Sequence, residues 1–93
     1  MNSYECMIIV KPDLGKEDAD KLLAHIKDII AKNKGSIDDV KELGKQRMSY
    51  YIKKYAEGFY YLVCFHADAS GIDKMKKAFA LSEAILRVLI VKI

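Results

Sequence analysis

The spacing of apolar residues changes several times along the chain, and these changes divide it into segments. Ser3–Val10 is a short apolar run that stops at a lysine and the only proline, which favours a buried strand over a helix. Lys16–Asn33 repeats apolar residues at steps of three and four, as an amphipathic helix does. Lys32 and Lys34 supply the positive charge that is common at the C-terminus of a helix, and Gly35 is a typical residue at which a helix ends.

The middle of the chain predicts a long hairpin. In Ile37–Lys53 the apolar residues first recur every three positions and then alternate strictly. We therefore expect one long strand with a bulge near Gly44, which returns the apolar side chains to one face of the sheet. The sequence KKYAEG supplies the turn, and the next stretch, GFYYLVCFH (residues 58–66), alternates with a period of two. Both faces of this stretch are largely apolar, which predicts a central strand. The alternation leaves open which face lies beneath the helices.

The last third predicts a helix and a strand. Ser70 and Asp73 resemble a capping box ahead of a second, shorter helix that ends near Ala80. Ala84–Ile93 is a nearly continuous apolar run and predicts the last strand. The order β-α-β-β-α-β predicts an α+β fold of the ferredoxin-like type, a four-stranded antiparallel sheet with two helices on one face. We expect residues 1–93 to form one domain.

Composition agrees with a globular protein, because 52% of its 93 residues are apolar and 31% are charged. No apolar run approaches the roughly 18 residues of a membrane helix, and the N-terminal sequence lacks the pattern of a signal peptide. Cys6 and Cys64 have no CxxC spacing and lie in apolar runs, as free thiols of a reducing compartment do. We therefore expect a cytoplasmic protein.

The distribution of charge is more informative than the net charge of +3. Leu43–Ala56 has no acidic residue and interleaves four cations with three tyrosines, namely Lys45, Arg47, Lys53 and Lys54 with Tyr50, Tyr51 and Tyr55. Such a hairpin suits contacts to phosphate and ribose. It equally suits a solvated edge strand whose lysines discourage aggregation. Composition alone does not separate these two interpretations.

Motifs for catalysis are missing. The five glycines form no phosphate-binding loop, and His25 and His66 are not spaced with the cysteines or an acid as metal ligands are. Nothing in the sequence suggests a nucleophile and a base held by a third group. We expect no enzyme activity, no catalytic or metal-binding residues, no cofactor and no small-molecule substrate.

The stretch EGFYYLVCF comes close to the ring-bearing strand of RNA-recognition domains, which share this element order. Three positions differ, because Glu57, Tyr60 and Cys64 replace a basic, a small and an aromatic residue. A free-standing module that binds single-stranded RNA by stacking bases on Phe59 and Tyr61 is therefore the alternative hypothesis. The favoured role for these rings is in the core or in a subunit contact.

Several spaced patterns together resemble one family, the bacterial small-subunit ribosomal protein six. They are YECMIIVKPDL near the start, KNKGSIDDVKELGKQRMSYYIKKYAEGFYYLVCF in the middle and LSEAILRVLIVK near the end. The resemblance implies the ferredoxin-like fold and a non-enzymatic component of the small (30S) ribosomal subunit. It further implies binding to the central domain of 16S rRNA as a pair with ribosomal protein eighteen.

The resemblance also indicates candidate site residues. The family's basic residues followed by L-A-Y-P-I-x-K fall on Lys45, Arg47, Met48–Ile52 and Lys54, with Tyr51 in place of the usual proline. Of two arginines that the family often carries near its end, Ala80 replaces one and Arg87 retains the other. We expect rRNA contacts from Lys45, Arg47, Lys53, Lys54 and Arg87. We expect partner-protein contacts from Tyr50, Tyr51, Phe59 and Tyr61.

Overall fold

A computed structural model describes residues 2–93 and contains the predicted elements in the predicted order. They are β1 (Asn2–Val10), α1 (Lys16–Lys32), β2 (Ser36–Ile52), β3 (Tyr55–Ala67), α2 (Ile72–Ala80) and β4 (Ile85–Lys92). A single 3-10 turn, Ala69–Gly71, precedes α2.

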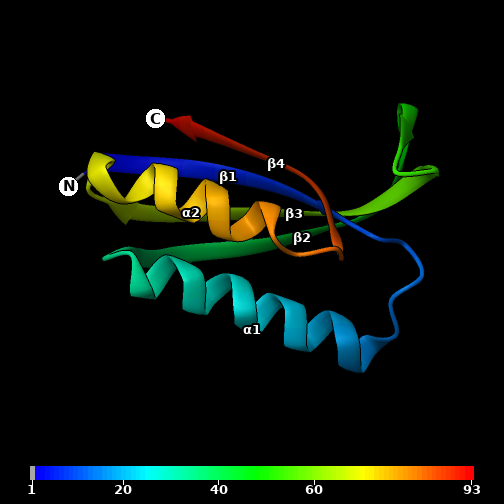
Figure 1. Cartoon of the computed structure of the whole chain (residues 1–93), viewed down its shortest axis with the longest axis horizontal. Coiled ribbons are helices and arrows are strands. Elements are labelled where there is room, and N and C mark those ends of the chain that lie inside the picture. The colour runs from blue at the N-terminus through cyan, green and yellow to red at the C-terminus, as the bar shows by residue number, and fades with distance from the viewer. Residues whose placement is uncertain (1) are drawn as a thin grey trace.

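The four strands form one sheet in the order β2-β3-β1-β4, and all neighbouring strands are antiparallel. Both helices lie on one face of this sheet, and the other face is open (Figure 1). The predicted α+β, ferredoxin-like fold is confirmed. Within the described part of the chain, no helix has the length and apolarity needed to cross a membrane.

The alternation along β3 resolves which of its faces lies beneath the helices. Tyr61, Val63 and Phe65 are buried and belong to the core, and Phe59 packs against its margin. The intervening residues, from Tyr60 to His66, face the open side and are half-buried. Buried side chains from four other elements complete the core, and the largest are Ile8, Val10, Ile26, Ile30, Met75 and Phe79. The predicted central strand is thus confirmed.

Two ionisable groups of this core are affected by burial. Burial raises the pKa of the Cys6 thiol to about 12, so Cys6 remains a neutral thiol that packs like a small apolar residue. Burial is also the main cause that raises the pKa of Tyr61, with smaller contributions from the negative charges of Glu42 and Asp20. Both side chains therefore act as packing groups.

The long strand β2 contains the predicted bulge. Its register with β3 shifts between Glu42 and Gly44, and Gly44 has a φ of 83°, a conformation that glycine adopts without strain. A second shift lies between Ile37 and Asp39, and the sequence pattern gave no sign of it.

The predicted capping box before α2 is wrong. Gly71 occupies the N-cap position, and no side chain makes a capping hydrogen bond. Ser70 lies inside the 3-10 turn, where the N–H of Gly71 donates to the carbonyl of Asp68 at 3.0 Å. This tight turn leads directly into the helix, so Ser70 is not at the N-cap position from which its hydroxyl could reach the free N–H groups.

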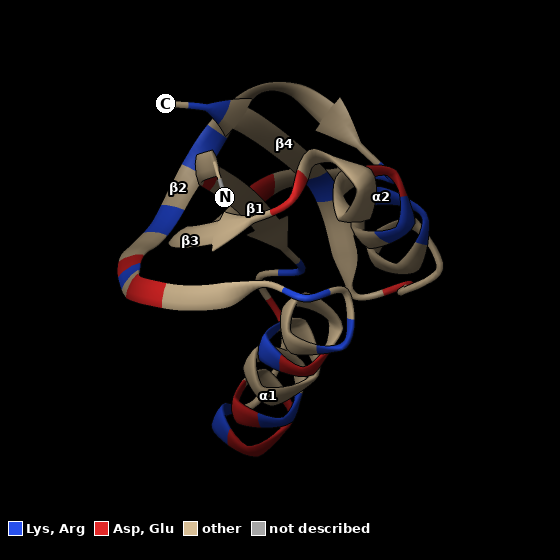
Figure 2. Cartoon of the chain, turned by 90° about the vertical axis from the view of Figure 1, so that its left-hand side faces the viewer, with Lys and Arg blue, Asp and Glu red and all other residues tan. Residues whose placement is uncertain are grey.

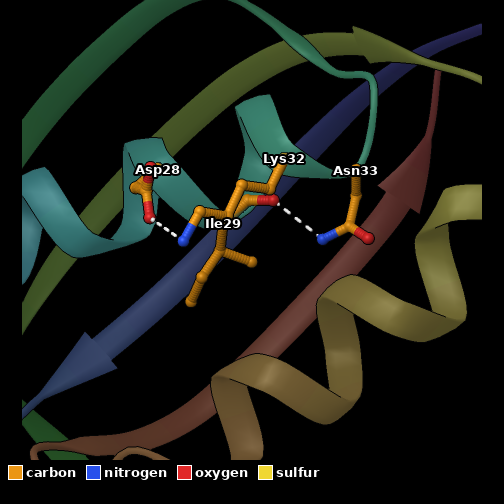
Figure 3. Close-up of polar contacts among 4 residues, drawn as sticks. All are labelled: Asp28, Ile29, Lys32 and Asn33. Carbon is orange, nitrogen blue, oxygen red and sulfur yellow. Dashed lines mark hydrogen bonds and ion pairs between the residues drawn. The ribbon is translucent and has the colours of Figure 1, made fainter.

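The C-terminus of α1 ends in a Schellman arrangement with a lysine in the left-handed position. Lys34 has a φ of 64°, its N–H donates to Ala31, and the N–H of Gly35 donates to Ile30 at 2.8 Å. Figure 3 shows the Asn33 side chain donating to the Ile29 carbonyl, and the ion pair of Lys32 with Asp28. The first contact measures 2.8 Å and the second 3.0 Å. The left-handed residue is thus Lys34, one position before the glycine that the sequence suggests as the stop.

Lys34→Gly should raise the free energy of unfolding, because it removes the cost of a left-handed L-residue. The gain should be at most about 1 kcal/mol, since glycine also makes the unfolded chain more flexible.

Gly35→Ala should lower the free energy of unfolding by about 1–3 kcal/mol, because the new Cβ would lie 2.5 Å from the Ile30 side chain and 2.8 Å from its carbonyl oxygen. Urea denaturation measures both changes. A Gly35→Ala variant as stable as the parent would contradict this account of the helix end.

Candidate nucleic-acid interface

β2 and β3 extend beyond the rest of the sheet and form a projecting hairpin arm, residues 45–57 (Figure 1). Regular pairing in the arm stops at Arg47 opposite Glu57 and resumes only at Ile52 opposite Tyr55. The turn consists of Lys53 and Lys54, whose φ values are 49° and 73°. Two central residues with positive φ are typical of a type I′ turn, which usually carries Asn-Gly. The chain therefore places two lysines where L-residues other than Asn and Asp are strained.

Arg47 and Arg87 meet in a cleft between the base of the arm and the open face of the sheet. Ile9 of β1 lies opposite Tyr60 of β3 on one side and opposite Arg87 of β4 on the other, so these three form one row across the open face. Arg47 and Tyr50 reach the same cleft from the arm, and Arg87 donates a hydrogen bond to the Tyr50 hydroxyl. The cleft has a volume of about 160 Å³. Two guanidinium groups next to two tyrosine rings are well suited to an anionic, ring-bearing ligand.

The other three predicted cations lie elsewhere on the arm. Lys45 lies over the Phe59 ring, 5.9 Å from its centroid, and shares a shallow hollow with Lys54. Lys53 turns toward the helix side, where its ammonium donates to the Ile85 carbonyl at 3.3 Å. Lys76 of α2 lines the same hollow as Lys53. The predicted rRNA residues thus form three neighbouring groups around the arm rather than one site.

Charge is segregated along β2. The first half contains the acidic residues Asp38, Asp39 and Glu42 together with Lys41, and the second half contains only the cations Lys45 and Arg47. In Figure 2 red and blue segments mix in the first part of β2 and along α1, whereas the end of β2 near the arm carries blue segments alone. The part of β2 in the arm is therefore purely cationic, and α2, with Lys74, Lys76 and Lys77 against Asp73, is a second basic element.

The four rings predicted to contact a partner protein are not equally accessible. Tyr50 and Tyr51 on the arm are 57% and 75% exposed. Phe59 is half-buried, and Tyr61 is only 8% exposed beneath the helices. The surface that these residues offer to another molecule is therefore mainly that of the arm tyrosines.

The structure adds residues that the sequence did not indicate. Tyr60 of β3 and Lys76 of α2 join the cation groups described above. An apolar row also crosses the open face, where Met7 lies opposite Leu62 on β3 and Leu89 on β4. Leu89 is about half exposed. Strand register places Tyr60 and the apolar row, and the position of α2 on the sheet places Lys76 near Lys53, so no sequence motif could have revealed them.

The fold and this surface define a small α+β domain of the ferredoxin-like type with a basic hairpin arm. Among residues 2–93, no three His, Cys, Asp or Glu side chains gather as a metal site would require. A sequence model described as Ribosomal protein S6 matches residues 3–92. The chain belongs to this family, which is a structural, non-enzymatic component of the small ribosomal subunit.

Relatives and solved structures agree with this assignment. The small ribosomal subunit protein bS6 of Thermoanaerobacter pseudethanolicus is 35% identical over 92 residues, covering 99% of this chain and 97% of the relative. The bS6 protein of Campylobacter jejuni is 34% identical over 92 residues, covering 99% of this chain and 74% of the relative. The crystal structure of 30S ribosomal protein S6 from Thermotoga maritima superposes with a TM-score of 0.92 at 29% identity, covering 99% of this chain and 87% of that one. The C-terminal domain of MgtC from Mycobacterium tuberculosis, at 10% identity and a TM-score of 0.65, shares the fold alone.

Replacing the strained turn by Asn-Gly (K53N/K54G) should raise the free energy of unfolding by about 1 kcal/mol, because both residues then accept positive φ. Thermal and urea denaturation measure the change. The matched control K53A/K54A removes the same two ammonium groups and leaves the strain, so it should be less stable than K53N/K54G. Equal stability of the two variants would show that the turn is not strained.

Proposed function

We propose that this protein binds the central domain of 16S rRNA on the small ribosomal subunit in the cytoplasm, together with ribosomal protein eighteen. The observation that carries this proposal is the convergence of Arg47 and Arg87 at the base of an arm whose single acidic residue is Glu57. Lys45, Lys53 and Lys54 add cations on the other sides of the same arm.

Contacts of this kind recognise the shape and charge of RNA rather than its sequence. Lysines neutralise phosphates as point charges, whereas arginines bind them through two parallel N–H donors. Folded RNA presents 2′-hydroxyls and phosphates across a shallow minor groove, which an arm rich in cations and tyrosines can follow. The cleft of Arg47, Tyr50, Tyr60 and Arg87 suits a phosphate with an adjacent sugar or base.

The strained turn supports the same proposal. Left-handed L-residues cost stability and cluster at functional sites. Lys53 and Lys54 occupy two such positions in succession at the end of the arm. Asparagine and glycine would fit this backbone better, so the retained lysines indicate that the two charges are useful there.

The partner-protein surface would comprise the arm tyrosines and the open face of the sheet. Tyr50 and Tyr51 are exposed, whereas Phe59 and Tyr61 lie on the helix side of β3 and would support this surface from beneath. The apolar row of Met7, Leu62 and Leu89 lies on the same open face as the Arg47–Arg87 cleft. A protein that docks on this row would lie next to the cations, so RNA could contact both proteins at once.

A free-standing single-strand binder is less well supported. Base stacking needs exposed ring faces, whereas Tyr61 is buried beneath the helices and Phe59 packs against the core. Titration with short RNA oligomers, followed by tyrosine fluorescence, tests this alternative. A response without any partner protein would favour it.

The first test of the proposal is charge reversal at the arm. K53E/K54E should weaken binding to the complex of rRNA and partner protein, and most strongly at low salt. The slope of log K against log salt concentration should fall by about two, because two phosphate contacts are lost. Filter binding over a range of salt concentrations measures both quantities. The control K74E/K77E makes the same charge change at exposed positions of α2 and should have a much smaller effect.

The turn variants separate binding from stability. K53N/K54G and K53A/K54A lose the same two ammonium groups, so they should weaken rRNA binding equally although their stabilities differ. Unchanged affinity of K53E/K54E at low and high salt would overturn the assignment of these lysines.

The second test concerns the partner. The isolated protein should bind a central-domain rRNA fragment weakly, and ribosomal protein eighteen should strengthen this binding at least tenfold, because pairing provides a joint surface. Leu89→Glu should weaken pairing, since it places a charge in the apolar row. Leu81→Glu, at an exposed leucine after α2, is the matched control and should leave pairing unchanged. Tight rRNA binding that the partner does not affect would contradict the proposal.

A further inference from the structure

A chain of polar contacts crosses three strands at the end of the sheet away from the hairpin arm. Its members are Asp38 of β2, His66 of β3 and Ser3 of β1. The Ser3 Oγ lies 2.8 Å from the His66 Nε2, and the Asp38 carboxylate forms an ion-pair contact with the His66 Nδ1. In Figure 1 the N-terminal end of β1 lies at the opposite side of the molecule from the arm. The rRNA-binding proposal does not involve these residues.

Strand register explains how three residues distant in sequence meet. Ser3 and His66 lie directly opposite each other on β1 and β3, so their side chains project from the same face. Asp38 is the unpaired residue of the register shift between Ile37 and Asp39. A bulge bends its strand and redirects a side chain, and here it brings the carboxylate to the imidazole. The side chains of His66 and Asp38 are each 44% exposed.

The contacts determine which ring nitrogen carries the proton in the neutral imidazole. A carboxylate only accepts hydrogen bonds, so the His66 Nδ1 carries the hydrogen and donates it to Asp38. The Nε2 then has a free lone pair and accepts the hydrogen bond of the Ser3 hydroxyl. This is the arrangement in which a serine is activated by a base that a third group orients.

We propose that Ser3 is an activated nucleophile and a site of covalent modification by activated acyl or phosphonyl donors. The Ser3 Oγ forms a bond to the acyl carbon or phosphorus while the bond to the leaving group breaks. The leaving group departs with the bonding electron pair. The hydroxyl proton moves to the His66 Nε2, and the Asp38 carboxylate stabilises the resulting imidazolium. That proton then passes to the leaving group or to water, so the step balances without a further reactant.

The surroundings of Ser3 favour a single adduct rather than turnover. Hydrolysis of an acyl adduct needs free N–H donors that stabilise an oxyanion. The Ser3 carbonyl accepts the N–H of Ile93 at 2.9 Å, and the next residue, Tyr4, is paired with Phe65 on one side and Lys92 on the other. Backbone groups near Ser3 are therefore occupied by the sheet. A stoichiometric modification site is compatible with a non-enzymatic family.

A fluorophosphonate probe tests the proposal, because it labels activated serines and releases fluoride. The full chain is treated with the probe and digested, and the labelled peptides are quantified by mass spectrometry. The Ser3 peptide should carry the label. His66→Gln and Asp38→Asn should each slow its labelling by at least about tenfold, since positioned general bases typically contribute about 10²–10⁴.

Two variants are matched controls. Ser36 also lies opposite His66 in the register of β2 and β3, and Ser36→Ala should leave the labelling of Ser3 unchanged. His25→Gln removes an exposed histidine of α1 and should also have no effect. Circular dichroism establishes that each variant is folded. If His66→Gln is unstable, Asp38→Asn still tests the proposal, because it preserves the shape of the side chain. Equal labelling of Ser3, Ser36 and Ser49, or labelling of Ser3 that persists at full rate in folded Asp38→Asn, would overturn the proposal.

Discussion

The antiparallel pairing of β1 with β3 is the interaction on which the rest of the structure depends. These two strands are paired over nine residues and occupy the centre of the sheet, so every second side chain of each must lie beneath the helices. This constraint takes Tyr61, Val63 and Phe65 into the core. It leaves Tyr60, Leu62 and His66 on the open face. Tyr60 lines the Arg47–Arg87 cleft, Leu62 belongs to the apolar row, and His66 belongs to the chain of polar contacts. A shift of one residue in this register would exchange the two sets and destroy both core and surface.

The unequal lengths of the strands produce the arm. β2 has 17 residues and β3 has 13, whereas β1 has nine and β4 has eight. The ends of β2 and β3 therefore project beyond their neighbours and have no helix to bury them. Side chains there are selected for solvent and for ligands rather than for packing. A group of cations is tolerable in this position because its members are exposed, and solvent and salt screen their mutual repulsion.

Periodicity predicted the elements and the fold, because alternation and helical stripes reflect burial directly. It also located the bulge at Gly44, since the change of spacing there had no other simple explanation. It failed at Ser70, where a local motif resembles a capping box but the chain enters α2 through a 3-10 turn. The meeting of Ser3, Asp38 and His66 could not be predicted, because it requires both the β1–β3 register and an unmarked bulge at Asp38. For the same reason, sequence suggested Arg47 and Arg87 separately but not the cleft that they share with Tyr60.

The chemical character of the open face changes from one end to the other, and this change affects how a ligand would lie on it. Along β1, Ile9 lies at the basic cleft, Met7 in the apolar row, and Glu5 and Ser3 toward the end that also contains Asp38. From Ile9 to Ser3 the strand extends about 20 Å, since each residue adds about 3.4 Å. This is about two and a half times the Debye length at physiological salt, so the acidic end does little to cancel the attraction that the arginines exert on phosphate. Close contact of RNA with the acidic end remains unfavourable. An RNA would therefore be confined to the arm, and the middle of the open face would be left to a protein with a complementary apolar surface.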